Sequence, residues 1–288
     1  VHERSGQRGV RRRDRGARRH CETQAAGGRR PEGLGHGPSL RWLLGFYGTF
    51  SDLAAATQCA ARYIPASHEH PILNELHSKH AEVTRESDYP VLFFIAPIAS
   101  ELQTVFDLGG SVGNLFFQLE RHLKFDKQLV WAVHDLPFKK SALLQLARVK
   151  REKRIMFADE FSYASGVDLF IVVGALHYFE SGLTDLLSGL TELPKHVIVN
   201  RSPFSDGKEI VVVQDGKHWL SPCKLHNAEK LICGMLGLGY QLVATWPVNE
   251  RIMRIPLNPE YNAPFRGFYF RRFDGVNEAQ EGAIDQKL

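Results

Sequence analysis

Short apolar runs recur along the chain between residues 105 and 272, and segments with helical periodicity separate them. These runs predict strands, in chain order, at 105–107, 129–134, 155–158, 169–173, 196–200, 240–245 and 267–272. The run 169–173 is apolar throughout, as expected for a strand covered on both faces. Helices are expected between the strands at 115–119, 141–148, 182–190 and 227–236. Such alternation predicts an α/β fold in which helices cover both faces of a largely parallel sheet.

Two further segments complete the predicted fold. The run 210–214, followed by Asp215 and Gly216, indicates a hairpin inserted before the helix at 227–236. Upstream, Ser51 or Asp52 is placed to cap a helix that ends near Ala61, and a second helical segment follows Pro71. We therefore expect residues 39–100 to form a helical cap or lid over the sheet domain at 101–274.

The ends of the chain have a different character. Residues 1–38 are rich in Arg and Gly and poor in large apolar side chains, so we expect them, like residues 275–288, to be disordered. A basic arm for RNA or lipid, or a true start near Leu40, are alternatives. Ten Arg face four acids in residues 1–40, which leaves 26 bases against 28 acids in the remainder. No nucleic-acid partner is expected for the folded part.

Other bulk features point to a soluble, cytoplasmic protein. The longest apolar run, 91–99, contains Pro97 and is much shorter than the roughly 20 residues of a membrane span. Four scattered cysteines, Cys21, Cys59, Cys223 and Cys233, form no Cys-x-x-Cys pair and are expected to be reduced.

The stretch 105–119 reads as a strand that ends on Asp107, a turn of small residues and a helix. Unpaired amides at the start of a helix can bind a polar or anionic ligand such as a nucleotide-like cofactor. A dinucleotide fingerprint, Gly-x-Gly-x-x-Gly, fails here because Ser111 and Asn114 stand at its second and third glycine positions. The pattern present is Asp107-x-Gly109-x-Ser111-x-Gly113.

This pattern resembles the first motif of the class I S-adenosylmethionine (SAM) methyltransferases, with Ser111 where a middle glycine is usual. The seven predicted strands, with the last two close together, also match the Rossmann-like sheet of that family, whose last strand is reversed. Residues 46–272 further resemble a poorly characterised bacterial methyltransferase family, through Asp107-Leu108-Gly109-Gly110-Ser111, Leu238-Gly239-Tyr240 and Gly267-Phe268-Tyr269-Phe270. Members are often encoded near surface-polysaccharide genes, which suggests a glycan-linked acceptor.

Three predicted strands end on acids, Asp107, Asp135 and Asp159, whose carboxylates suit the ammonium, ribose and adenine donors of such a cofactor. The segments at 135–137, 159–161 and 176–178 resemble successive motifs of small-molecule O-methyltransferases. That resemblance assigns the ribose to Asp135, the adenine side to Asp159, and the methionine portion to the glycine turn and Asp107. The residues expected to bind SAM are Asp107, Gly109, Gly110, Ser111, Gly113, Asp135, Leu136, Asp159, Glu160 and Phe161.

His177 follows the fourth predicted strand and aligns with the catalytic His of plant-type O-methyltransferases, so it is the candidate base. A wall residue without a proton role is the alternative. Asn200, Arg201 and Ser202 could contact the acceptor, and Trp219, Tyr178 and Phe204 could wall its pocket.

No metal site is predicted. His68, His70, His77 and His80 lack a completing Cys or acid, and Cys223-x-x-His226 lacks a second pair. The sequence thus predicts a SAM-dependent methyltransferase acting on an oxygen of a small-molecule or glycan-related acceptor. A non-catalytic methyltransferase-like partner module and a nicotinamide-dependent oxidoreductase are the alternatives.

Overall fold

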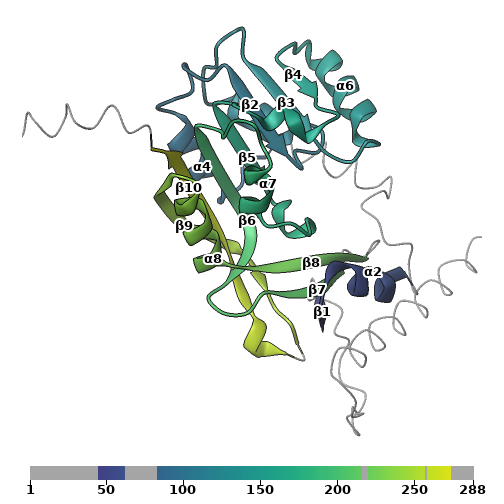
Figure 1. The fold of residues 1–288 in the computed structure, drawn as a ribbon. Helices are drawn as coiled ribbons and strands as arrows, with labels where there is room; N and C mark the ends of the chain where they lie inside the picture. Colours follow the sequence, from purple (N-terminus) through teal and green to yellow (C-terminus); the bar gives the residue numbers. More distant parts are fainter. Residues whose placement is uncertain (1–44, 62–82, 216–219, 257, 274–288) are drawn as a thin grey trace, which may run out of the picture.

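The computed structural model describes residues 45–61, 83–215, 220–256 and 258–273 (Figure 1). The helices are α2 (Leu53–Ala61), α4 (Asp88–Ile95), α5 (Asn114–Leu119), α6 (Lys139–Lys150), α7 (Leu183–Ser188) and α8 (Ala228–Gly237), with short 3₁₀ turns η1 (Phe161–Ala164), η2 (Leu176–Tyr178) and η3 (Pro259–Tyr261). The strands are β1 (Phe46–Phe50), β2 (Thr104–Leu108), β3 (Val130–His134), β4 (Ile155–Phe157), β5 (Leu169–Val173), β6 (His196–Ser205), β7 (Ile210–Asp215), β8 (Leu220–Asn227), β9 (Tyr240–Met253) and β10 (Ala263–Arg272).

The central sheet has the predicted topology. Its strands lie in the order β4-β3-β2-β5-β6-β10-β9, in which β4, β3, β2, β5 and β6 are parallel neighbours. Strand β10 is antiparallel to β6 and to β9, so the last strand of the chain is inserted, reversed, between its two neighbours. This is the predicted class I methyltransferase sheet with its reversed final strand.

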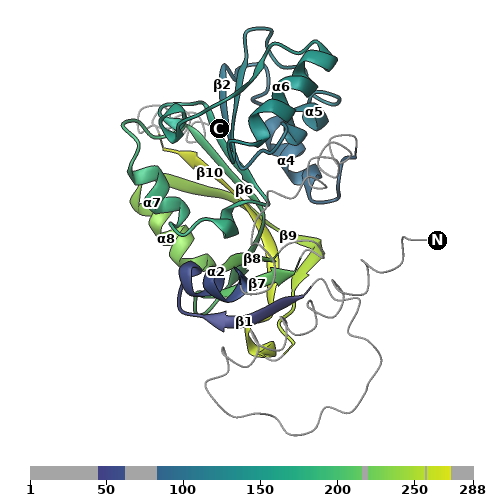
Figure 2. The same cartoon turned by 90° about the vertical axis from the view of Figure 1, so that its right-hand side faces the viewer.

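Alternate residues of each strand enter separate cores on the two faces of the sheet. Val105, Ile171 and Ile198 pack with α4, α5 and α6 on one face. Phe106, Val172, Val199 and their neighbours pack with α7 and α8 on the other. Figure 2 shows α4, α5 and α6 on one side of the sheet and α7 and α8 on the other. Because successive side chains point to opposite faces and both faces are covered, these strands read as continuous apolar runs.

Local signals in the sequence account for several boundaries. The Asn227 side chain accepts a hydrogen bond from the Lys230 amide at the start of α8. At the start of α2, Asp52 Oδ1 accepts a hydrogen bond from the Ala55 amide at 2.7 Å. Both are N-cap contacts, which satisfy an amide that the helix itself leaves unpaired.

A smaller antiparallel unit extends one end of the molecule. The predicted hairpin is β7 paired with β8, and β1 adds to the free edge of β7. Figure 1 shows this unit and α2 beside the far ends of β9 and β10, away from β2, β3 and β4. The expected helical cap at 39–100 is therefore corrected at Phe46–Phe50, where pairing with β7 makes a strand. The proposed second helix after Pro71 lies outside the described residues.

Strands β6, β9 and β10 extend well beyond their predicted bounds. We expected the fifth strand to end at Asn200 before Arg-Ser-Pro, but β6 continues to Ser205 because β10 and then β8 pair with its extension. Between the pairs Val199↔Phe268 and Ser202↔Arg266, two residues of β6 face the single residue Gly267. This arrangement is a β-bulge, a feature that redirects side chains and is common beside functional sites.

Two bulk expectations have different outcomes. Cys59 is disulfide-bonded, whereas Cys223 and Cys233 are free, so the expectation that all cysteines are reduced is wrong for Cys59. Within the described ranges, every helix is too short or too polar to cross a bilayer.

Candidate functional site

The glycine turn lies at the carboxyl end of β2 and has the backbone geometry that its glycines suggested. Gly109 and Gly113 have φ values of +69° and +80°, in the left-handed region that side chains rarely adopt. Ser111, at the position where the methyltransferase motif that this turn resembles usually has glycine, also has a positive φ, 57°. The serine therefore keeps the glycine-like path of the turn, at a cost of about 1–2 kcal/mol in backbone strain.

The turn packs tightly against the end of β5. A methyl group on Gly109 would lie 2.2 Å from the Cβ of Ala175, so only glycine permits this approach. A methyl group on Gly110 would lie 2.4 Å from Cγ of Asp107, which places this carboxyl group directly beneath the turn. Asp107, the turn and the residues after β5 therefore form one compact unit.

Asp107 is buried, with 1% of its surface exposed, and its Oδ2 accepts a hydrogen bond from Trp131 Nε1 at 3.1 Å. Burial and, to a smaller extent, the nearby Asp135 carboxylate raise the pKa of Asp107, while the Trp131 bond and Arg201 oppose the shift; the net value is about 7. Near neutral pH the group is thus poised between its neutral and ionised forms. A cationic ligand beside it would favour the carboxylate. Our sequence reasoning missed Trp131, since nothing in an apolar strand marks a polar role for its indole.

Asp135 joins the same cluster from the end of β3. Its Oδ2 accepts a hydrogen bond from the Ser111 amide at 2.8 Å, and its Oδ1 accepts one from the Leu136 amide at 2.6 Å. Burial raises the pKa of Asp135, and these two backbone bonds partly offset the shift. The carboxylate thereby ties the glycine turn to the next strand, as expected if both contact one ligand.

The residues after β4 lie farther out. Asp159 is exposed and forms an ion pair with Lys140 of α6 at 2.7 Å. Glu160 is also exposed, while the Phe161 ring packs edge-on against Phe106 and His134. No contact joins Asp159 to Asp107 or Asp135 among the interactions of the described residues. The assignment of Asp159 and the residues after it to the adenine side therefore stays a prediction.

His177 lies in η2, just after β5, and is 1% exposed. Its ring is 4.1 Å from that of Tyr178 and 6.0 Å from that of Phe265, measured between centroids. Tyr178 in turn donates a hydrogen bond to Gln214 of β7 at 2.6 Å. The candidate base is thus covered by the β7–β8 unit and by β10, and its catalytic role stays a prediction.

The other candidates divide in three ways. His68, His70, His77, His80 and Trp219 lie outside the described residues. Cys223 and His226 are both buried, and no group of metal-ligating side chains occurs in the described part of the chain. Asn200 is fully buried between the Ser87 carbonyl, which accepts from its Nδ2 at 2.8 Å, and the Trp246 indole, which donates to its Oδ1 at 3.1 Å.

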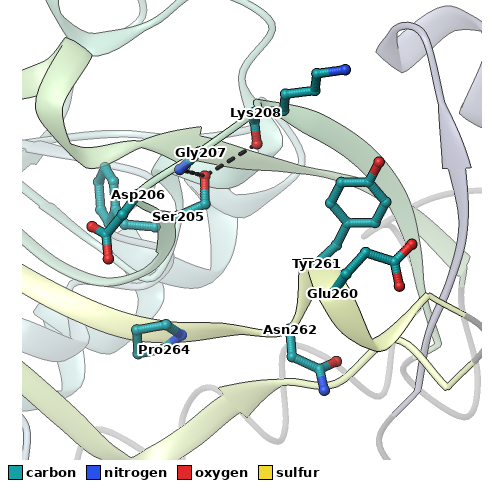
Figure 3. A pocket seen from close by; sticks show the side chains of 9 residues that line it. Ser205, Asp206, Gly207, Lys208, Glu260, Tyr261, Asn262 and Pro264 are labelled. Carbon is teal, nitrogen blue, oxygen red and sulfur yellow. Dashed lines mark hydrogen bonds between the residues drawn. The ribbon is translucent and has the colours of Figure 1, made fainter.

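A cavity of about 250 Å³ lies elsewhere, between the loop after β6 and the segment before β10 (Figure 3). Its lining residues are Phe204, Ser205, Asp206, Gly207, Lys208, Glu260, Tyr261, Asn262 and Pro264. None of the predicted cofactor residues lines it. Phe204, which we expected to wall an acceptor pocket, does line this cavity.

Comparison with known proteins gives similarity at the level of solved structures. No family model matches the chain, and no curated protein matches it. A SAM-dependent methyltransferase from Clostridium acetobutylicum aligns with 70% of this chain and 99% of its own, at 10% identity and a TM-score of 0.46. Magnesium protoporphyrin IX methyltransferase from Synechocystis aligns with 72% of this chain and 86% of its own, at 13% identity and a TM-score of 0.45.

A third similar structure is 1,6-didemethyltoxoflavin-N1-methyltransferase from Burkholderia thailandensis, which aligns with 73% of this chain and 92% of its own. Its identity is 16% and its TM-score 0.44. Because these scores are low, the assignment of the fold rests on the strand order and the reversed β10, and not on the alignments.

Proposed function

We propose that this chain, whose sheet is that of the class I methyltransferases, is a SAM-dependent methyltransferase that methylates an oxygen of a small-molecule or glycan-linked acceptor. The observation that carries the proposal is the compact unit of Asp107, the turn at 109–113 and Asp135 at the carboxyl ends of β2 and β3. In parallel sheets of this type, ligands bind beyond those strand ends.

The residues present fit SAM by charge and by their hydrogen-bond acceptors. Asp107 would face the cation of the amino-acid portion, and Asp135 would accept hydrogen bonds from the ribose hydroxyls. Gly109, Gly110 and Gly113 carry no side chains that would obstruct a ligand lying across the turn. The cofactor, when bound, supplies an electrophilic methyl group on a sulfonium.

The protein's part in the reaction is to position the acceptor and to accept its proton. Bound SAM would supply its methyl group to the acceptor oxygen, and His177 is the candidate base that would accept the hydroxyl proton. Positioning alone can account for a large share of the acceleration, because it removes the entropic cost of bringing two reactants into line.

The direct test is titration calorimetry with SAM and, separately, with NADH. We expect saturable binding of SAM and none of NADH. A screen of hydroxylated small molecules and glycan precursors with tritium-labelled SAM then tests for turnover. Binding of NADH instead of SAM would favour the hypothesis of a nicotinamide-dependent oxidoreductase. SAM binding without transfer to any acceptor would favour the hypothesis of a non-catalytic partner module.

His177→Asn is expected to lower kcat at least about 100-fold and to leave the affinity for SAM within about twofold, because a general base acts on the chemical step. The pH profile should also lose the limb that reports the base. Tyr178→Phe is the matched control, since it keeps the ring beside His177 and removes only the bond to Gln214. Full activity of the His177 variant would show that this residue lines the site without a role in proton transfer.

SAM binding is expected to depend on pH through Asp107. The raised pKa means that the free folded protein holds a proton on Asp107 up to about pH 7. This proton stabilises the folded state relative to the unfolded state. The stabilisation is fully present below pH 3.8 and is lost as the pH rises through 7. A bound ammonium group favours the carboxylate, and binding below pH 7 must therefore release a proton. We expect affinity to fall roughly tenfold per pH unit below 7.

Calorimetry in two buffers of different ionisation enthalpy measures this proton release. Asp107→Asn should bind SAM more weakly at pH 8 and should lose the pH dependence between 5.5 and 8. A wild-type affinity that is constant over this range would contradict the placement of the ammonium group at Asp107.

A further inference from the structure

Three arginines from separate parts of the chain meet beside the predicted methyl-transfer site. Arg201 leaves the bulge of β6, Arg251 lies on β9, and Arg85 precedes α4. Burial and, to a smaller extent, the positive charges of Arg85 and Arg251 lower the pKa of Arg201, while Asp88 and Glu250 oppose the shift; the net value is about 10. Burial also lowers the pKa of Arg85, and here too Arg251 adds to the effect. The three guanidinium groups thus lie close enough to repel one another.

The acids of this cluster are already engaged by other groups. Asp88, which is fully buried, pairs with Arg201 at 2.9 Å and also accepts a hydrogen bond from the Arg85 backbone amide at 2.9 Å. Glu250 accepts hydrogen bonds from both the amide and the hydroxyl of Ser87. Within the described part of the chain, neither the Arg85 nor the Arg251 guanidinium forms an ion pair. The Asp88 and Glu250 carboxylates act on both Arg85 and Arg201, so three guanidinium groups face two carboxylates and the cluster keeps one excess positive charge.

The backbone places Arg201 at the carboxyl ends of the parallel strands, where the cofactor site is predicted. Its φ is +52°, an uncommon value for a side chain as long as arginine, and it belongs to the bulge opposite Gly267. A methyl group on Gly174, the residue after β5, would lie 3.8 Å from Cβ and from Nε of Arg201. Arg201 also acts electrostatically on Asp107. Strain of this kind is held by surrounding structure and is typical of functional sites.

Arg251 of β9 lies beside the ring of Phe265, which is also a neighbour of His177. Its guanidinium lies 5.7 Å from the centroid of the Phe265 ring, and the His177 ring also neighbours Phe265, at 6.0 Å between centroids. Arg251 also acts electrostatically on Tyr178. Arg251 and the candidate base therefore share a neighbour, the Phe265 ring.

We propose that Arg251, Arg201 and Arg85 bind an anionic group of the methyl acceptor, a carboxylate or a phosphate, and so place its hydroxyl beside His177. Guanidinium groups bind the paired oxygens of these anions through two parallel hydrogen bonds, which fixes orientation as well as position. This inference rests on the proposed methyltransferase function and deepens it: the acceptor is an acidic molecule, not a neutral one.

The test titrates the protein, with and without saturating S-adenosylhomocysteine, with inorganic phosphate, sodium glucuronate and glucose at constant ionic strength. We expect saturable binding of phosphate or glucuronate and none of glucose, and the stronger of the two anions identifies the group carried by the acceptor. Arg251→Gln and, separately, Arg85→Gln should weaken anion binding at least tenfold. Arg254→Gln, an exposed arginine three residues beyond Arg251, should leave it unchanged.

Absence of saturable anion binding, binding of glucose equal to that of glucuronate, or equal losses in the Arg251 and Arg254 variants would each overturn the inference. Binding of S-adenosylhomocysteine is measured first by calorimetry in every variant, and it should not change. Failure of the cofactor to bind rejects the methyltransferase proposal, whereas cofactor binding without anion binding rejects only the acidic acceptor.

Discussion

Asp135→Ala is expected to weaken SAM binding roughly 10- to 100-fold, measured by calorimetry at pH 8. Hydrogen bonds to a charged group contribute about 1.5–3 kcal/mol, and removal of the carboxylate deletes those proposed to the ribose. The substitution also removes the acceptor of the Ser111 amide, so the glycine turn loses its link to β3. Both effects act on the bound state, and we expect them to raise the dissociation constant without abolishing the fold.

Asp126→Ala is the matched control. Asp126 is an exposed acid that precedes β3, where it accepts a hydrogen bond from the Gln128 amide, whereas Asp135 follows the same strand. The two residues therefore lie at opposite ends of β3. An Asp135 variant that binds SAM as tightly as the Asp126 variant would remove Asp135 from the cofactor site.

Gly267→Ala is expected to destabilise the protein by about 3 kcal/mol. A methyl group at this position would lie 2.0 Å from Cε2 of the Trp246 indole, and Trp246 is 7% exposed, so the ring has little room to move. Overpacking of this kind costs about 1–3 kcal/mol. Displacing the ring also breaks the bond from Trp246 Nε1 to Asn200, for about 1 kcal/mol more.

Thermal unfolding measures this effect, and a loss of roughly 5–10 °C in Tm is expected for a domain of this size. Gly207→Ala is the control, because no heavy atom lies within 4 Å of its added methyl group. Its stability should stay within about 0.5 kcal/mol of the wild type. Equal Tm values for the two variants would show that the Trp246 ring yields without cost.

The consequences of Gly267→Ala should extend to the arginine cluster. Asn200 is held between Trp246 and the Ser87 carbonyl, and the next residue of the bulge is Arg201. A shift of the indole is therefore transmitted to Asn200 and Ser87, the residues that precede Arg201 and Asp88. We expect anion binding to weaken in this variant even at temperatures where the protein stays folded.

The sequence alone determined the parts of this protein that depend on neighbouring residues. Strand β5 was predicted at Leu169–Val173, where the structure has it, because an apolar run between turn signals is a local property. The caps of α2 and α8 could be read from Asp52 and Asn227, because a side-chain oxygen and a helix amide lie within one turn of each other. Glycine at 109 and 113 permits the positive φ that the turn has there, because it lacks a Cβ.

Only the tertiary structure decided which distant groups meet. Phe46–Phe50 became a strand because β7 offers it an edge, and β6 passes Pro203 because β10 and β8 pair with it. Trp131 beside Asp107, and Arg85 and Arg251 beside Arg201, have no marker in their own segments. Burial and charge at a site are set by contacts across the sheet, and the order of residues along a chain does not encode those distances directly.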